Sequence, residues 1–368
     1  MKSIGIIGTH GIPAKYGGFE TFAQEVSPLF ANAGFFVTVY CDRPESNNSL
    51  SYFGNVKLRH LTTSKSKKPL LYYYLSIYYG LKENDIVIVA GTGGSFFYFL
   101  NFFFRKILIT NTDGVESRRA KWSFIKKRLI KLSEKLAVIF SNHLVADSNG
   151  ISQYLLETYP KIHQNKLSTI EYGAHINTSL IPEVLKKHQL EKDNYFLVVS
   201  RLEPENNLQM IVEGYKLTNE TKPLIIVGNL INNSYVNSLL EYQSERIRFI
   251  GGIYNKEELS SLRTGAFAYI HGHSVGGTNP SLLEALGSSN ICICHDNIFN
   301  REVTDNKQLY FSDANELKSS IEELKNYENN QIITLKNNAR LRITSYYNWE
   351  NIATKYLALL KKYETTSS

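Results

Sequence analysis

The chain has 368 residues, of which 43% are hydrophobic and 20% charged, so it is not a disordered protein and is too long for one ordinary domain. The net charge of +7 is uneven, because residues 1–178 hold 21 Lys and Arg against 12 Asp and Glu. Only the first half is therefore expected to be drawn to an anionic surface or substrate, and a nucleic-acid-binding protein is not expected. The three cysteines are not clustered as metal ligands would be. Cys292 and Cys294 alternate as in a strand, so we expect them to be buried, unpaired thiols in a reducing cytosol.

Strand-like runs alternate with helical patterns twice along the chain. The first series contains the runs SIGIIG, FFVTVYC, DIVIVAG, KILIT and HLVADS. After the polar stretch LIPEVLKKHQLEKDN, a second series contains YFLVVS, PLIIVG, IRFIGG, AFAYIHG and NICICHD. This alternation predicts two doubly wound α/β domains that face each other across a central cleft. We expect one domain over 1–180, a second over 193–345, and a C-terminal helix over 346–368 that packs back on the first domain.

One uncharged stretch is long enough to be tested as a membrane span. Residues 86–104 hold no charge over 19 residues, but IVIVA is β-branched and GTGG is a turn. The remaining SFFYFLNFFF gives about 15 Å of helix, roughly half of a hydrocarbon core. We expect a buried strand followed by a short buried or interfacial helix.

The stretch HSVGGTNPSLLEALG, residues 273–287, predicts a helix with an exposed amide end. Asn279 is a favoured N-cap and Pro280 a favoured first residue, while Gly276 and Gly277 leave the approach without side chains. Such a helix start binds anions. An ordinary capped helix after a glycine turn would have the same sequence.

Two charged residues accompany this helix start. Arg201 ends the strand YFLVVS and is expected at the same sheet edge, where it would bind a diphosphate. Glu284, one turn into the helix, is expected to accept from a ribose hydroxyl; the alternative is an exposed surface glutamate.

A second glycine-rich approach to a helix lies in GIIGTHGIPAKYGGFE. Gly17 and Gly18 precede the helical pattern, and the two loops together would close on one phosphate group. The stretch does not contain the dinucleotide fingerprint G-x-G-x-x-G, which weighs against an NAD-dependent epimerase or dehydrogenase.

The stretch SRRAKWSFIKKRLIKLSEK, residues 117–135, holds eight Lys and Arg and one Glu. Trp122, Ile125, Leu129, Leu132 and Leu136 recur at helical spacing, which predicts a helix with a buried stripe and a cationic face. That face is expected to contact anionic lipid or a lipid pyrophosphate; the alternative is a solvated surface.

Four stretches resemble one family in order and spacing: IGIIGTHGIPAKYGGFETFAQEV, NTDGVESRRAKW, SRLEPENN and HGHSVGGTNPSLLEAL. The chain resembles GT-B glycosyltransferases of the large retaining family four, in the branch typified by bacterial rhamnosyltransferases. The resemblance implies two Rossmann-like domains, with the sugar nucleotide on the C-terminal one and the acceptor on the N-terminal one. It also implies metal-independent transfer without a cofactor, dTDP-L-rhamnose as donor and a lipid-pyrophosphate-linked saccharide as acceptor. The product would be a surface polysaccharide such as capsule or O-antigen, made by a cytoplasmic protein on the inner face of the plasma membrane.

The resemblance and the residue patterns described above together suggest a role for each candidate residue. The donor residues are Gly17, Gly18, Arg201, Asn206, Tyr254, Gly276, Gly277, Thr278, Asn279 and Glu284. The acceptor residues are Asp113, Glu116, Arg118 and Arg119. The catalytic residues are Asp113, Arg201 and His273, with Asp113 orienting the acceptor or assisting proton transfer; its alternative role is an Asx turn or helix cap.

Two positions differ from the wider family pattern. The family has a Glu at the position of Gly276 and a Lys at the position of Asn206. We expect His273 to replace the missing Glu, and backbone amides of residues 277–279 to take more of the leaving-group charge. The same fold also serves UDP-GlcNAc, UDP-glucose or GDP-sugar donors, and the sequence does not identify the base.

Overall fold

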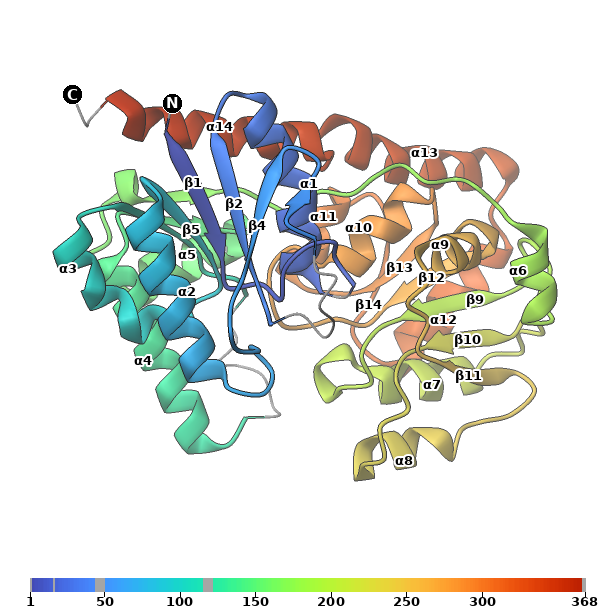
Figure 1. The fold of residues 1–368 in the computed structure, drawn as a ribbon. Coiled ribbons are helices and arrows are strands. Elements are labelled where there is room, and N and C mark those ends of the chain that lie inside the picture. The colour runs from blue at the N-terminus through green and yellow to red at the C-terminus, as the bar shows by residue number, and fades with distance from the viewer. Residues whose placement is uncertain (1, 16, 44–49, 115–121, 366–368) are drawn as a thin grey trace. The chain divides into compact units, whose positions relative to one another are not determined.

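The fold comes from a computed structural model that describes residues 2–15, 17–43, 50–114 and 122–365. The chain divides into two compact units (Figure 1). Among the described residues, the first unit contains 2–15, 17–43, 50–114, 122–172 and 349–365, and the second contains 173–348. The first unit therefore ends before residue 180, and the C-terminal helix belongs to it.

The first unit is built on an eight-stranded sheet that is parallel except for its β3 edge. In spatial order its strands are β3 (Tyr52–Phe53), β4 (Val56–His60), β2 (Phe36–Cys41), β1 (Ser3–Ile7), β5 (Ile86–Ala90), β6 (Ile107–Asn111), β7 (His143–Ala146) and β8 (Leu167–Thr169). Its helices are α1 (Gly18–Asn32), α2 (Pro69–Glu83), the 3-10 helix η1 (Ser95–Leu100), α3 (Asn101–Phe104), α4 (Phe124–Phe140), α5 (Asn149–Thr158), the 3-10 turn η3 (Gln164–Lys166) and α14 (Trp349–Thr365).

The second unit has a six-stranded, fully parallel sheet. In spatial order its strands are β11 (Ile247–Gly251), β10 (Leu224–Val227), β9 (Phe196–Val199), β12 (Ala268–His271), β13 (Cys292–His295) and β14 (Leu309–Phe311). Its helices are α6 (Pro182–Lys187), the 3-10 turn η4 (Pro204–Asn206), α7 (Leu208–Lys216), α8 (Ser234–Leu240), α9 (Lys256–Gly265), α10 (Pro280–Gly287), α11 (Ile298–Thr304), α12 (Ala314–Lys325) and α13 (Asn329–Ser345).

The strand order of each sheet shows where its chain direction reverses, and this locates the expected ligand site. In the second sheet the chain runs outward one way from β9 and the other way from β12, so the reversal lies between these neighbours (Figure 1). The first sheet reverses between β1 and β5. Open parallel sheets bind ligands beyond the carboxyl ends of the strands at such a reversal. The predicted doubly wound α/β architecture is confirmed.

The terminal helix packs on the first unit through one buried face. Trp349, Ile352, Tyr356 and Leu359 of α14 are all buried. The Tyr356 ring lies 5.1 Å from that of Phe22 on α1, and its hydroxyl accepts a 3.2 Å hydrogen bond from Asn111. Cys292 and Cys294 are buried and free, as the strand alternation predicts.

Helix α4 corrects one sequence prediction. The stripe expected to be buried is largely exposed: Ile125, Leu129 and Leu132 all face solvent. The burial on this helix falls instead on Ser133, Glu134, Ala137 and Val138. Among the described residues, no helix combines the length and the apolar character needed to cross a membrane.

Candidate active site

Helix α10 of the second unit begins as predicted. Asn279 is its N-cap and accepts a 2.9 Å hydrogen bond from the Ser281 amide, while Pro280 takes the first helical position. Thr278 is buried just before the cap. The amide end of this helix therefore starts from a fixed loop, which favours binding of an anion.

The glycine before this cap is required by both backbone and space. Gly276 has a φ of +125°, in the region that only glycine adopts readily. A Cβ atom added there would lie 3.3 Å from Nε2 of His273. His273 therefore lies beside the position where the wider family has its first Glu.

Asn206 connects the two loops at this sheet edge. Its Nδ2 donates to the Arg201 carbonyl at 2.6 Å, so its Oδ1 is the acceptor facing His273 Nδ1, also at 2.6 Å. In a neutral ring this places the His273 proton on Nδ1, so that Nε2 is the acceptor nitrogen. Asn206 is buried and uses its amide within the protein, which makes it a positioning residue for Arg201 and His273.

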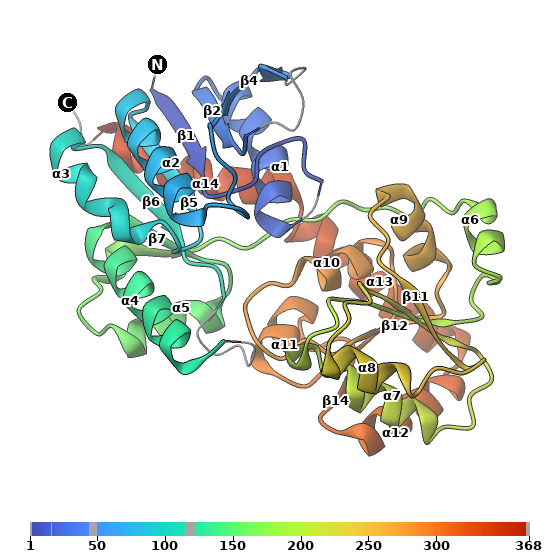
Figure 2. The same cartoon turned by 60° about the horizontal axis from the view of Figure 1, so that its bottom comes forward.

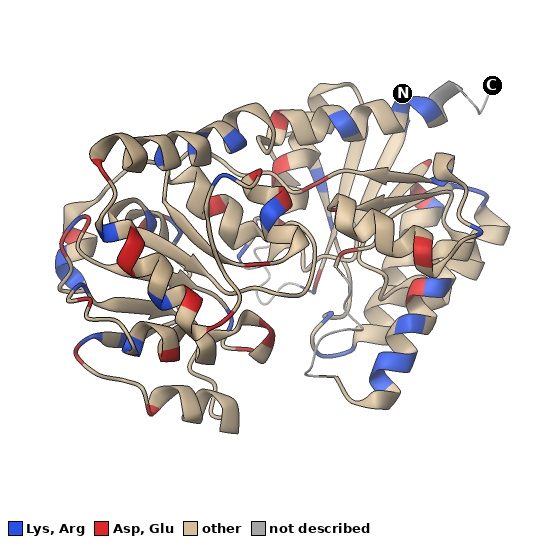
Figure 3. Cartoon of the chain, turned by 180° about the vertical axis from the view of Figure 1, so that it is seen from behind, with Lys and Arg blue, Asp and Glu red and all other residues tan. Residues whose placement is uncertain are grey.

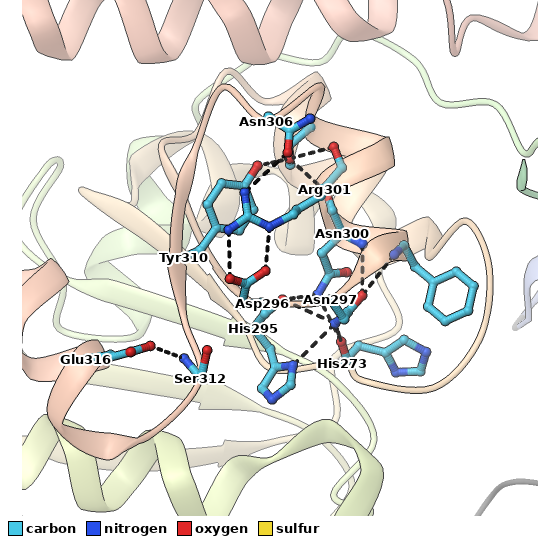
Figure 4. A network of polar contacts seen from close by, with 12 residues as sticks. His273, His295, Asp296, Asn297, Asn300, Arg301, Asn306, Tyr310, Ser312 and Glu316 are labelled. Carbon is cyan, nitrogen blue, oxygen red and sulfur yellow. Dashed lines mark hydrogen bonds and ion pairs between the residues drawn. The ribbon is translucent and has the colours of Figure 1, made fainter. Parts of the chain in front are cut away.

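Further bonds hold the same loop in place (Figure 4). The His273 carbonyl accepts from Nδ2 of Asn297 at 3.0 Å and from Nδ2 of Asn300 at 2.9 Å. The Ser274 amide and hydroxyl both donate to the Glu205 carbonyl, at 3.0 and 2.9 Å. Sequence reasoning missed Asn297 and Asn300, whose only signal was their place directly after the strand NICICHD.

Arg201 and Glu284 both reach solvent. The Arg201 side chain is 45% exposed and lies 3.5 Å from the Glu203 carboxylate. Glu284 is 48% exposed and forms a 2.5 Å ion pair with the buried Arg263. The apolar neighbours of Glu284 favour burial, but the structure places its carboxylate at the surface, where Arg263 fixes its position. Tyr254, which follows β11, is also exposed.

Two buried polar groups lie at the same edge of the second sheet. Both carboxylate oxygens of Glu205, and Nε2 of His271, have no hydrogen-bond partner in the described part of the chain. Burial, with His273 and His295 nearby, lowers the pKa of His271 well below its usual value, so its ring is neutral.

In the first unit, the start of α1 differs from that of α10. Gly17 is the N-cap with a φ of +107°, Gly18 is the first helical residue, and no side chain caps the helix. A Cβ on Gly17 would lie 2.1 Å from Oε2 of Glu20, whose Oε1 accepts from the His10 amide at 2.7 Å. This helix start therefore faces a carboxylate of its own, and a phosphate would meet that negative charge.

A lysine lies at the centre of polar groups at this edge of the first sheet. Lys65 Nζ donates to the Gly8 carbonyl at 2.6 Å. Burial lowers the pKa of Lys65, and the carboxylates of Glu20, Asp42 and Asp113 oppose that shift. Three segments far apart in the sequence, the first turn of α1 and the loops after β2 and β6, thus bring three acids near one ammonium group.

Asp42 and Asp113 occupy different settings in this cluster. Asp42 accepts from His10 and Ser64, each at 2.9 Å, and from the Lys65 amide at 3.0 Å. Asp113 has a φ of +61° and follows β6, and its amide donates to Asn111. Burial raises the pKa of Tyr73 to about 12, with contributions from Asp113 and Glu20. Sequence reasoning found Asp113 but not Lys65 or Asp42; Glu116, Arg118 and Arg119 lie outside the described residues.

Comparisons with known proteins agree with this architecture. Residues 181–360 match the family model described as glycosyl transferases group 1, and residues 1–175 match a domain of unknown function, DUF1972. Over its whole length the chain superposes on the whole of sucrose-phosphate synthase from Thermosynechococcus elongatus, with a TM-score of 0.84 at 16% identity. The chain has the GT-B fold. Anabaena HepE, solved with UDP-glucose, matches 98% of this chain over 100% of its own, with a TM-score of 0.76 at 13% identity.

A curated relative matches in sequence. The O-antigen chain mannosyltransferase RfbU of Salmonella typhimurium is 27% identical over 211 residues, which are 56% of this chain and 56% of that protein. The match therefore spans about half of the relative's length.

Proposed function

We propose that the protein is a retaining GT-B glycosyltransferase that moves L-rhamnose from dTDP-L-rhamnose to a lipid-linked saccharide in bacterial surface polysaccharide synthesis. The group 1 match over the second unit and the O-antigen relative support the glycosyltransferase activity and the polysaccharide class. The four stretches that resemble the rhamnosyltransferase branch support the donor and the acceptor.

One observation carries the proposal: the loops after β9 and β12 present a capped helix start, an exposed arginine and a histidine at the reversal of the second sheet. The diphosphate would bind at the amides that begin α10 and at Arg201. When the sugar–phosphate bond breaks, negative charge grows on the departing nucleotide, and fixed donors lower the barrier by roughly 3 kcal/mol each. Gly277, Thr278 and Asn279 hold these amides, and no side chain at Gly276 obstructs the approach.

We assign His273 to a hydroxyl of the donor sugar. Its Nε2 is an acceptor beside Gly276, where the wider family has a carboxylate. A neutral imidazole accepts a hydrogen bond from a hydroxyl without adding negative charge next to a diphosphate. Glu284, held by Arg263, would accept from the ribose, and exposed Tyr254 would stack on the base.

The first unit would bind the acceptor. Asp113 lies at the carboxyl end of β6, near the Lys65 ammonium, and would orient the acceptor hydroxyl. Glu20 would accept a further hydroxyl, so Gly17 and Gly18 would contact sugar and not phosphate. The leaving phosphate would take the acceptor proton on the front face, which retains configuration.

We also propose that transfer needs neither metal nor cofactor. In the described part of the chain, no group of three His, Cys, Asp or Glu is arranged to hold a metal ion. Turnover measured with and without EDTA tests this, and strong inhibition by EDTA would refute it.

The direct test of donor identity is a transfer assay with dTDP-L-rhamnose and synthetic lipid-pyrophosphate saccharides, followed by mass spectrometry. The HepE complex with UDP-glucose favours a second candidate, a UDP-sugar donor on the same fold. Thermal shifts with dTDP, UDP and GDP separate the two, because the nucleotide that binds the native state raises the melting temperature most. We expect dTDP to give the largest shift. A larger shift with UDP would indicate that the donor is a UDP-sugar and not dTDP-L-rhamnose.

A further inference from the structure

The first unit exposes a group of large apolar side chains on three helices. We call it the α2–α4 face, defined by Leu70 on α2, Phe102 and Phe103 on α3, and Phe124, Ile125 and Leu129 on α4. Phe103 is 80% exposed and Ile125 is 73% exposed. Isolated apolar residues are common on surfaces, but a clustered set of this size marks a surface that binds a partner.

The three helices are joined by packed aromatic rings. Tyr78 of α2 meets Phe104 of α3 at 5.8 Å, and Phe102 of α3 meets Phe140 of α4 at 5.7 Å. Helices α2, α3 and α4 lie on the same side of the first unit (Figures 1 and 2), and all three pack against η1. Phe102 therefore lies against the C-terminal end of α4, and exposed apolar residues continue from there along α4 at helical spacing: Ile139, Leu132, Leu129 and Ile125.

The exposed charges on α4 are of one sign. Lys126, Arg128, Lys131 and Lys135 are exposed, and Figure 3 shows Lys and Arg recurring along this helix. Its acid, Glu134, is buried and accepts from the hydroxyls of Tyr154 and Tyr159. The solvent face of α4 thus combines apolar side chains with positive charge only.

The cations lie against the rings of the same helix region. Lys126 Nζ is 3.8 Å from the ring centre of Trp122, and the Arg128 guanidinium is 4.5 Å from that of Phe124. This arrangement puts positive charge at the same depth as aromatic rings, as at the boundary between lipid headgroups and acyl chains.

We infer that the α2–α4 face lies in the surface of an anionic lipid bilayer, with the apolar side chains among the acyl chains and the lysines and arginines on the headgroups. Charge complementarity favours this partner. A second copy of the chain docking through the same face would oppose cations to cations, because a two-fold contact pairs each patch with itself. The inference extends the proposed function, because α4 follows the Asp113 loop in the chain and a bilayer there would present a lipid-linked acceptor to the same unit.

Vesicle flotation tests this inference without donor or acceptor. We expect the full chain to float with phosphatidylcholine vesicles containing about one-third phosphatidylglycerol, and to bind pure phosphatidylcholine vesicles several-fold more weakly. Phe103→Ser with Ile125→Ser should reduce binding to anionic vesicles by about tenfold or more. Lys126→Gln with Arg128→Gln should reduce it less and weaken its dependence on salt.

A matched control changes exposed apolar residues of the second unit. Ile333→Ser with Leu341→Ser alters two side chains on α13 that are more than half exposed, and should leave flotation unchanged. Circular dichroism confirms that each variant folds. The inference is overturned if the wild-type chain does not float, if the control loses as much binding, or if light scattering shows a dimer that Phe103→Ser with Ile125→Ser dissociates. Flotation without transfer would instead contradict the proposed function alone.

Discussion

The two helix starts that follow glycine pairs differ in what they offer a ligand. At α10, Asn279 caps the helix and Gly276 leaves space beside His273 Nε2. At α1, no side chain caps the helix and the Glu20 carboxylate covers Gly17. Similar glycine sequences thus produce a start that favours an anion and one that already faces an acid. The difference lies in the residue three positions after the glycine: Glu20 follows Gly17 by three, whereas α10 has Asn279 three after Gly276.

The largest expected effect is at Arg201. Arg201→Ala should lower kcat about a hundredfold, because a cation that stabilises the departing diphosphate is lost. Steady-state kinetics with saturating donor measures this. Arg340→Ala, which removes an exposed arginine from α13, should leave kcat unchanged. Equal turnover of Arg201→Ala and wild type would show that Arg201 does not stabilise the departing diphosphate.

His273 should affect the sugar and not the nucleotide. His273→Ala should lower kcat/KM for the donor about tenfold through loss of one hydrogen bond to a hydroxyl, while the affinity for free dTDP stays the same. His273→Gln, which keeps an acceptor, should recover part of the loss. If dTDP binding falls as much as kcat/KM, His273 contacts the nucleotide or acts only through the fold.

The two helix starts should respond differently to loss of their own polar side chain. Asn279→Ala should lower the free energy of unfolding by about 1 kcal/mol, because α10 loses its N-cap. It should also weaken dTDP binding about fivefold, because the amides at the start of α10 are no longer held in place. Glu20→Gln should leave dTDP binding unchanged and raise KM for the acceptor. Calorimetric titration with dTDP measures the first effect, and acceptor kinetics the second. Weaker dTDP binding in Glu20→Gln would show that the start of α1 contacts the donor nucleotide.

Acid stability should report on the Lys65 cluster. Burial acts to raise the pKa of Asp42, but hydrogen bonds from His10, Lys65 and Ser64 lower it below its usual 3.8. Because the folded pKa is depressed, this carboxylate stabilises the fold above pH 3.8, and that contribution is lost as the pH falls through the folded pKa. Asp42→Asn should therefore reduce the free energy of unfolding at pH 7 by about 1–2 kcal/mol, and the difference should shrink in acid. Urea unfolding at several pH values measures this; a difference that does not change with pH would assign the loss to packing.

Local sequence patterns predicted features that depend on neighbouring residues. Asn279 and Pro280 set the start of α10, and the stripe of α14 is buried as its spacing indicates. The prediction that the apolar stripe on α4 is buried was wrong, because periodicity shows which residues share a helix face but not whether that face points inward. Lys65, Asp42 and Glu20 come from three separate segments of the chain, two loops and the first turn of α1, so no local spacing could reveal their cluster. The same holds for Asn206, whose bond to His273 spans 67 positions.

Backbone amide resonances on addition of dTDP test the central claim most directly, because they compare both helix starts in one experiment. We expect the amides of Gly277, Thr278 and Asn279 to shift with saturating behaviour while those of Gly17 and Gly18 do not. Shifts at Gly17 and Gly18 with none at 277–279 would contradict the assignment of the donor diphosphate to the start of α10.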